Sequence, residues 1–405
     1  MNRNIQARPC RCRECEAEKK RTGRHPRPKG TRQHPITYRV RWRQNGRQFS
    51  RGGFTRKVDA EEFLTETLAD VQRGDAPNPL AARQTFEDFA ERWLADRQAA
   101  LTPKTYSGYR DIVNAHLVPA FGPMPLGSID PTHVSDLVRD LKKKLAPNTQ
   151  RNVWRVLKQI MDEAVALRAI RQTPCTDATR KKLSAPRRNE MLALTSDEVA
   201  RLAEALGERD PQLRVLIYLA ADTGCRWGEL IGLRVRDFDP LHGVLHVRQN
   251  ITYAQGAWHV GRPKGLPANK EARVLTLSPF VAAMLTAHIK NRVPDALVFA
   301  SPRRATDYLR SRATHDHFKK ATAKVLPEAK HGLRFHDLRH TCAALLIANG
   351  AHPKAISDRL GHSTIQITMD RYGHLYPNAD EALAEGLDRV WRAANGSDEE
   401  LREAE

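Results

Sequence analysis

Residues 336–341 read His-Asp-Leu-Arg-His-Thr, and they open a segment with a clear helical pattern. The segment ends at Asn349-Gly350, a typical helix terminus. Because His336 and Arg339 are three residues apart, a helix places both side chains on one face, where they can grip one phosphate together. Apolar residues follow them at helical spacing: Leu338, Cys342, Leu345 and Leu346.

The bare pattern His-x-x-Arg is a weak signal by itself. It also occurs at residues 259–262 and 331–334 of this chain. Only the match at 336–339 begins a helix with an apolar stripe, so context favours it over the other two.

The sequence after this helix contains a second and a third helical stretch. Residues 353–360 form a short helical segment that ends at Gly361, and His362-Ser363 follow directly. Another helix is expected to run towards Tyr372. Taken alone, His362 is typical of a capping or surface histidine, and Tyr372 of a core or interface tyrosine.

An arginine stands at a helix start further upstream, in the stretch Thr-Gly-Cys-Arg-Trp-Gly-Glu-Leu of residues 223–230. Gly224 ends one predicted helix, and Glu229 to Leu233 begin the next. A helix start favours anions, so Arg226 points its guanidinium where a phosphate can bind. By itself, Arg226 is also compatible with an ordinary surface arginine.

Four blocks together resemble the site-specific tyrosine recombinases of the phage integrase family. They read TGCRWGEL (223–230), HDLRHT (336–341), LGHS (360–363) and MDRYGHLYP (369–377), in the order and with the separations typical of that family. The resemblance covers residues 194–383 and extends to the helical region before them. It implies an enzyme that cuts and rejoins DNA through a 3′-phosphotyrosine link, and so integrates or excises a mobile element.

The resemblance assigns roles to individual residues. It implies Tyr372 as the nucleophile, with Glu229 as a supporting carboxylate. The scissile phosphate would contact Arg226 and Arg339, and hydrogen bonding and proton transfer would fall to His336 and His362. The family also uses a lysine on a β-hairpin between the first arginine and the His-x-x-Arg block; Lys264 is the first choice for that role and Lys270 its competitor.

This chemistry explains why such side chains are needed. Two guanidinium groups neutralise and orient a phosphodiester whose oxygens are negative. A tyrosine hydroxyl, with an ordinary pKa near ~10, needs a base or a strong positive field before it attacks. A lysine can protonate the leaving 5′ oxygen. The sequence contains no Walker loop and no His-Glu-x-x-His motif, so we expect neither a nucleotide nor a metal cofactor.

The charge of the chain points to DNA as the partner. The 405 residues carry a net charge of +20, and residues 1–58 alone hold 18 Lys or Arg against three acidic residues. No run of about 18 apolar residues could span a membrane, and no signal peptide opens the chain. We therefore expect a cytoplasmic protein, associated with the nucleoid when bound to DNA, whose six cysteines stay reduced.

The fold class expected is a multidomain, mainly α protein with five segments. Residues 1–35 form a basic Cys-containing arm too poor in apolar residues to build an ordinary core. Residues 36–75 form an arm-type DNA-binding module of three strands, the third near Phe54, and one helix. Residues 84–178 form a helical-bundle core-binding domain, residues 190–390 an α+β catalytic domain, and residues 391–405 an acidic tail. The DNA-binding residues outside the catalytic domain would be Arg39, Arg41, Arg43, Lys181, Lys182, Arg187 and Arg188.

The arm also offers a candidate metal site. Cys10, Cys12 and Cys15 could supply three zinc thiolates with a nearby histidine as fourth ligand, although this spacing is not a standard zinc-finger pattern. Three reduced thiols in a basic tail that contacts DNA nonspecifically explain the same residues equally well, and we expect no metal.

Partners follow from the resemblance. The family implies double-stranded attachment sites, a homo-tetramer on DNA, and accessory proteins that bend DNA or set direction. Residues 381–391 carry Leu383, Leu387 and Val390 at helical spacing, and we expect them to dock on a neighbouring subunit. Two alternatives remain: a type IB topoisomerase that relaxes DNA, and a noncatalytic DNA-binding protein on the same scaffold.

Overall fold

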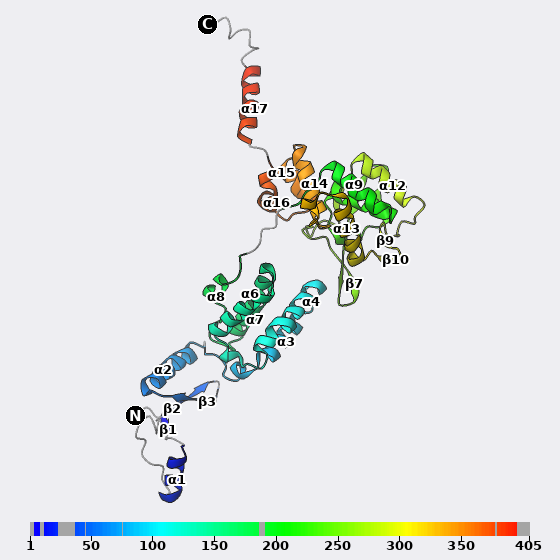
Figure 1. Cartoon of the computed structure of the whole chain (residues 1–405). Coiled ribbons are helices and arrows are strands. Elements are labelled where there is room, and N and C mark those ends of the chain that lie inside the picture. Colours follow the sequence, from blue (N-terminus) through cyan, green and yellow to red (C-terminus); the bar gives the residue numbers. More distant parts are fainter. Residues whose placement is uncertain are drawn as a thin grey trace, which may run out of the picture. The chain divides into compact units, whose positions relative to one another are not determined.

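The computed structural model describes residues 4–8, 12–22, 37–44, 46–74, 76–185, 191–376 and 379–394. The chain divides into two compact units, residues 1–188 and residues 189–405 (Figure 1). Both are mainly helical, as expected from the sequence.

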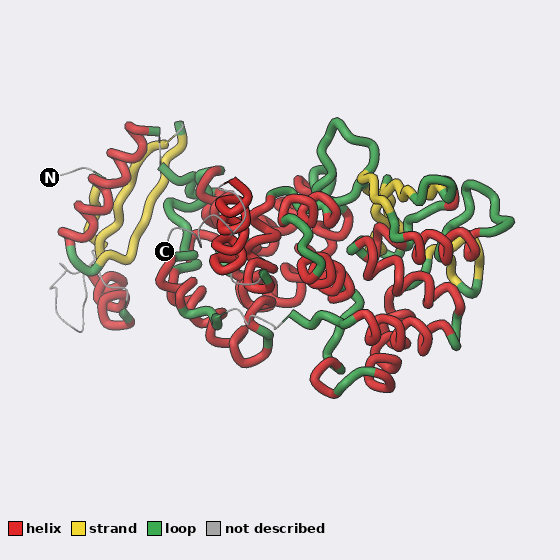
Figure 2. The backbone as a smooth tube through the Cα atoms, turned by 90° about the horizontal axis from the view of Figure 1, so that it is seen from above, coloured by secondary structure: helices red, strands yellow, loops and turns green. Residues whose placement is uncertain are grey.

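The first unit begins with a three-stranded antiparallel sheet in the order β1-β2-β3. Its strands are Ile5–Arg8, Thr37–Gln44 and Arg47–Phe54. Helix α2, Lys57–Arg73, packs along the sheet (Figure 2). Alternation in β2 turns Val40 and Trp42 into the core beside Ala60 and Leu64, so the apolar face predicted for this strand is confirmed.

The third strand was expected in the wrong place. Residues 47–54 form one continuous strand, and the third strand is Ile5–Arg8, inside the stretch expected to remain an arm. Helix α1, Arg13–Thr22, also lies there. Gly52-Gly53 reads as a break in the sequence, but Gly53 takes φ +96° and the pairing continues through a register shift.

The rest of the first unit is a helical bundle. Its helices are α3 Phe86–Arg97, α4 Pro103–Ile112, α5 Val118–Phe121, α6 Pro131–Lys144, α7 Pro147–Ala166 and α8 Asp177–Lys181. Thr102 and Asp130 cap α4 and α6, each before a proline, as predicted. Phe86, Val138 and Leu157 are fully buried representatives of the three predicted apolar stripes.

The second unit combines helices with small sheets. It begins with α9 Ser196–Gly207, α10 Pro211–Thr223 and α11 Trp227–Leu230. The strands β4 Phe238–Asp239, β5 Val244–Val247 and β8 Arg273–Thr276 form one sheet, and β6 Asn250–Ala254 pairs with β7 Ala257–Gly261 as a hairpin. Then come α12 Pro279–Ile289, the pair β9 Ala300–Ser301 and β10 Arg304–Tyr308, and α13 Ser311–Val325.

The last helices of the second unit are α14 Asp337–Ala348, α15 Pro353–Leu360, α16 Ile365–Tyr372 and α17 Ala379–Ala394. The first three pack on one another around a small core that includes Cys342, Ile356, Leu360 and the ring of Tyr372. On α17, the side chains of Leu383, Leu387 and Val390 are more than half exposed. The described part of the chain contains no helix long and apolar enough to cross a membrane.

Candidate active site

The turn between α10 and α11 positions two arginines. Gly224 ends α10 with φ +62°, and a Cβ there would come within 2.3 Å of the side chain of Leu360, so only glycine fits. The carbonyl of Gly224 accepts a hydrogen bond of 2.7 Å from Nη1 of Arg339. Arg226 then begins α11. The turn thus holds one arginine and starts the helix that carries the other.

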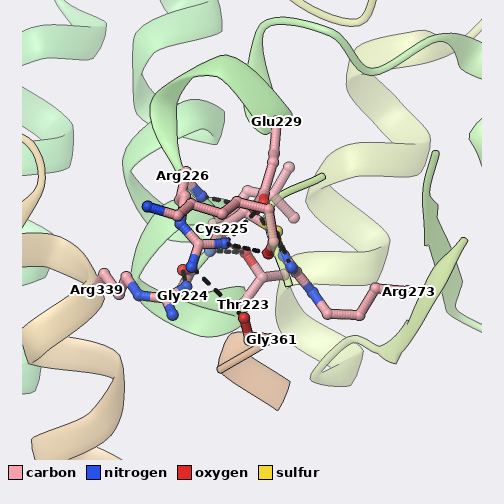
Figure 3. A network of polar contacts seen from close by, with 10 residues as sticks. Thr223, Gly224, Cys225, Arg226, Glu229, Arg273, Arg339 and Gly361 are labelled. Carbon is pink, nitrogen blue, oxygen red and sulfur yellow. Dashed lines mark hydrogen bonds and ion pairs between the residues drawn. The ribbon is translucent and has the colours of Figure 1, made fainter. Parts of the chain in front are cut away.

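A buried carboxylate fixes Arg226. Glu229 is fully buried, and its two oxygens accept hydrogen bonds from Nη1 and from the backbone N–H of Arg226, at 3.0 and 2.9 Å. On the other side, Nη2 of Arg273 donates to Glu229 at 2.7 Å and to Sγ of Cys225 at 3.3 Å (Figure 3). Burial alone would raise the pKa of Glu229, but the charges and hydrogen bonds of Arg273 and Arg226 outweigh it and lower the pKa.

Arg273 was not among the sequence candidates. A signal was present, because strand alternation places Arg273 on the buried side of β8 together with Leu275. A charge on an inward-facing strand position needs a buried partner of opposite charge. Its partner Glu229 lies 44 positions earlier, which no local pattern reveals.

Arg339 carries a buried charge with an unused donor. The residue is 3% exposed, and no acceptor among the described residues lies within hydrogen-bonding distance of its Nη2. Burial, followed by the charge of Arg226, lowers its pKa to about 10. A buried guanidinium that lacks a carboxylate partner is a strong binding point for an anion.

Two predicted histidines surround the arginines. His362 follows Gly361, whose carbonyl lies 3.5 Å from Nη2 of Arg226, and its Nδ1 is 2.8 Å from Oγ1 of Thr368. Partial burial, and then the charges of Arg339 and Arg226, lower the pKa of His362 to about 4. His336 precedes α14 and is exposed; crowding by the protein around it, and then the charge of Arg339, lower its pKa too. Both rings are therefore neutral near pH 7.

Tyr372 ends α16, and its side chain is fully buried. Its ring stacks beside that of His362, with 6.4 Å between centroids. Burial raises the pKa of Tyr372 although Arg339 and Arg371 act in the opposite direction. The positive field therefore does not ionise the hydroxyl, and attack by Tyr372 requires a proton acceptor.

His340 is a second residue absent from the candidates. Its Nδ1 lies 2.9 Å from the hydroxyl of Tyr372. His340 stands in the quoted block HDLRHT, but a residue beside a recognised pattern carries no signal of its contacts, so only the structure identified this pair.

Both candidate lysines lie after β7, not on the β6–β7 hairpin itself. Lys264 and Lys270 are exposed in the segment that leads to β8. The carbonyl of Lys264 is 3.3 Å from Nη1 of Arg226, and a Cβ at Gly265 would come within 2.7 Å of the carbonyl of Gly361. Lys270 lines a cleft of about 910 Å³ that also includes His362. The backbone contact with Arg226 favours Lys264.

The other predicted residues lie outside this cluster. On β2, Arg43 is exposed while Arg39 and Arg41 are half-buried, and Lys181 and Lys182 are exposed at the end of α8. Arg187, Arg188 and Cys10 lie outside the described residues. Cys12 and Cys15 belong to the described part of the arm, in which no group of three or more potential metal ligands occurs.

Known proteins match the chain over most of its length. Residues 193–379 match the phage integrase family, and residues 85–142 match the phage integrase N-terminal SAM-like domain. The integrase of Mycobacterium phage FRAT1 is 30% identical over 351 residues, which cover 82% of this chain and 98% of that protein.

Two solved structures share the fold. The Tn1549 transposon integrase in complex with a circular intermediate DNA has a TM-score of 0.63 and 21% identity, covering 75% of this chain and 99% of that one. A lambda integrase tetramer bound to a Holliday junction has a TM-score of 0.52 and 22% identity, covering 81% of this chain and 93% of that one. The sequence-based expectation of the fold is thereby confirmed.

Proposed function

The chain belongs to the phage integrase family, and from this premise we propose that Tyr372 is the nucleophile with which it cleaves and rejoins DNA. The protein is a site-specific DNA recombinase of the tyrosine type. One observation carries the assignment of the site: two arginines converge beside a buried tyrosine, and Nη2 of Arg339 has no acceptor among the described residues.

The proposed reaction begins when the scissile phosphate binds Arg226 and Arg339. Nη2 of Arg339 gains its missing acceptor, and both charges offset the negative charge that develops on the phosphate oxygens. His336 and His362, neutral in the DNA-free protein, each donate a ring N–H to an oxygen of the same phosphate. Glu229 keeps Arg226 in place.

Strand cleavage then needs two proton movements. Tyr372 loses its proton as its oxygen bonds to phosphorus, and the leaving 5′ oxygen gains a proton, for which we propose Lys264, with Lys270 as the alternative donor. The 3′-phosphotyrosine bond keeps the energy of the broken phosphodiester. A 5′ hydroxyl from another strand can therefore reverse the step without a nucleotide cofactor or a bound metal.

The remaining segments have proposed roles in DNA binding. The 36–75 module, with Arg39, Arg41 and Arg43, would bind arm-type sites, and the 84–178 bundle and the 190–390 catalytic region would bind the core site. The DNA backbone would also be contacted through its phosphates by Lys181, Lys182, Arg187 and Arg188. The basic arm 1–35 would add nonspecific contacts with DNA phosphates. Phosphate contacts make such binding strongly dependent on salt.

Assembly is proposed to be tetrameric, because strand exchange between two sites needs paired active sites. The exposed apolar side chains of α17 would dock on a neighbouring subunit. Accessory proteins that bend DNA, or that select integration or excision, would assist. Recombination would take place on the nucleoid in the cytoplasm.

Joining of two circular plasmids that each carry a candidate attachment site tests this function. We expect the wild-type protein to produce joined circles without added nucleotide or metal, and the Tyr372→Phe variant to bind both sites but join none. Relaxation of the plasmids without joining would support a topoisomerase instead. Tight binding with neither reaction would support a noncatalytic DNA-binding protein.

A further inference from the structure

The hydroxyl of Tyr372 contacts a histidine that family resemblance did not assign. Nδ1 of His340 lies 2.9 Å from this hydroxyl, and the two rings meet edge to face with 5.6 Å between centroids. His340 is 6% exposed and Tyr372 is not exposed at all. Within residues 191–376 the hydroxyl has no other hydrogen bond, so His340 is its partner in the DNA-free protein.

The direction of this hydrogen bond follows from the surroundings. Burial, opposed by the charge of Asp337, lowers the pKa of His340 to about 4, so its ring is neutral at pH 7. The hydroxyl of Tyr372 keeps its proton because burial raises its pKa. A protonated hydroxyl beside a neutral ring nitrogen donates the hydrogen bond, and Nδ1 accepts it.

The second ring nitrogen of His340 faces a carboxylate. Oδ1 of Asp337 lies 3.9 Å from Nε2, which carries the ring proton when Nδ1 accepts. Asp337 is itself held by Arg334, whose backbone N–H and Nη2 donate to it at 2.7 and 2.8 Å. At 3.9 Å the carboxylate is too far for a hydrogen bond, so Asp337 acts on His340 through its charge and would stabilise the ring once it is protonated.

His336 occupies a different position. It is exposed, and its ring lies 5.7 Å from that of His340. The described residues include no hydrogen bond between His336 and Tyr372. His336 is therefore placed for the phosphate, and His340 for the nucleophile.

We propose that His340 is the catalytic residue that takes the proton of Tyr372 during strand cleavage. The proposal rests on Tyr372 as the nucleophile. As the tyrosine oxygen bonds to phosphorus, its proton moves to Nδ1 of His340, and the bond from phosphorus to the 5′ oxygen breaks. That oxygen leaves with a proton from the lysine. When a 5′ hydroxyl attacks the phosphotyrosine, it gives its proton back to that lysine as its oxygen bonds to phosphorus. The bond from phosphorus to the tyrosine oxygen breaks, and His340 returns its proton to that oxygen. Asp337 offsets the transient positive charge of His340.

Single-turnover cleavage of nicked duplexes with two different leaving groups tests this proposal. One duplex has the ordinary 5′ oxygen at the scissile position and the other a bridging 5′ sulfur, which leaves without help from an acid. We expect His340→Asn, which keeps a polar atom near the position of Nδ1 but cannot take up a proton, to slow cleavage of both duplexes by about 10²-fold or more. Lys264→Ala should slow only the oxygen substrate.

Controls separate a chemical role from a structural one. His374→Asn changes an exposed histidine two residues after the nucleophile and should cleave at the wild-type rate. In His340→Ala, added imidazole should restore part of the lost rate, because a free base can occupy the space left by the ring, whereas a misfolded site would not recover. The His340 variants should bind DNA with wild-type affinity at the same salt concentration, and their melting temperatures should equal that of the wild type.

Other outcomes would contradict either the role of His340 or that of Tyr372. Wild-type cleavage rates in both His340 variants would overturn the role of His340, as would a defect that disappears with the sulfur leaving group or fails to respond to imidazole. If the wild-type protein forms no adduct through Tyr372, the proposed nucleophile is wrong, and the role of His340 is wrong with it.

Discussion

The two sides of the active site are built on opposite principles. The arginine side is charged and held by ion pairs and hydrogen bonds. Glu229 pairs with both Arg226 and Arg273, and Arg339 donates a hydrogen bond to the carbonyl of Gly224. The tyrosine side is neutral, and His340 forms the single hydrogen bond of the Tyr372 hydroxyl among the described residues. The phosphate site is thus formed before DNA arrives, whereas the nucleophile is stored as a buried, protonated hydroxyl.

Removal of Arg339 should impair phosphate binding on the arginine side and leave the contact between Tyr372 and His340 in place. We expect Arg339→Ala to slow single-turnover cleavage by about 10³-fold, because a buried donor and a charge at the phosphate are both lost. Arg339→Lys should recover little, since an ammonium group cannot replace the planar fork of donors. Arg209→Ala, at an exposed site in the same unit, should cleave normally. A loss of less than tenfold in Arg339→Ala would mean that the phosphate binds elsewhere.

Glu229→Gln tests how much the ion pairs of the arginine side contribute to the free energy of unfolding. The change leaves the buried charge of Arg273 without its partner, and we expect the second unit to lose about 3–5 kcal/mol of unfolding free energy. The exposed pair of Glu204 with Arg214, 2.7 Å apart, is the matched control, and Glu204→Gln should cost less than about 1 kcal/mol. Equal losses in calorimetry would show that Glu229 is not a structural centre.

The two candidate lysines belong to neither side of the site. Each is a candidate to protonate the leaving 5′ oxygen during cleavage. Lys264→Ala should reduce cleavage by about 10²-fold, while Lys270→Ala should change it by less than about threefold. Single-turnover rates on one duplex measure both. The reverse result would assign the leaving-group proton to Lys270.

Acid should weaken the tyrosine side before the arginine side. The pKa values of His340 and His362 are each lowered to about 4 from an ordinary value near ~6.5. A depressed histidine pKa contributes stability above the ordinary value, and this contribution is lost as the pH falls from there towards the folded value.

We therefore expect the melting temperature of the second unit to fall between pH 7 and pH 4.5, by about 2–4 °C for each kcal/mol lost. Calorimetry with His362→Asn provides the check. A drop that stays the same size in this variant would contradict the contribution of His362.

The resemblance of four sequence blocks selected Arg226, His336, Arg339, His362 and Tyr372, each of which alone is compatible with an ordinary structural role. The structure places these side chains near one another, and their catalytic roles stay proposals. The apolar stripes of the bundle were predictable because helical spacing is a local property.

Arg273, His340 and the strand at residues 5–8 were not predictable in this way. Arg273 matters through a carboxylate 44 positions away, and His340 through a tyrosine 32 positions away. The short strand contains few apolar residues and is defined by pairing with β2. In all three cases tertiary contacts, and not local pattern, determine the role of the residue.

We propose that Tyr372 becomes joined to the 3′ phosphate of a cleaved strand. The most direct measurement is mass spectrometry of the protein–DNA adduct formed on a nicked duplex that carries the site protected by the protein from nuclease digestion, in the presence of a metal chelator. We expect a 3′-phosphoryl adduct on the peptide containing Tyr372, and none in Tyr372→Phe. A bound, protected duplex without any adduct, or an adduct on another residue, would contradict the account.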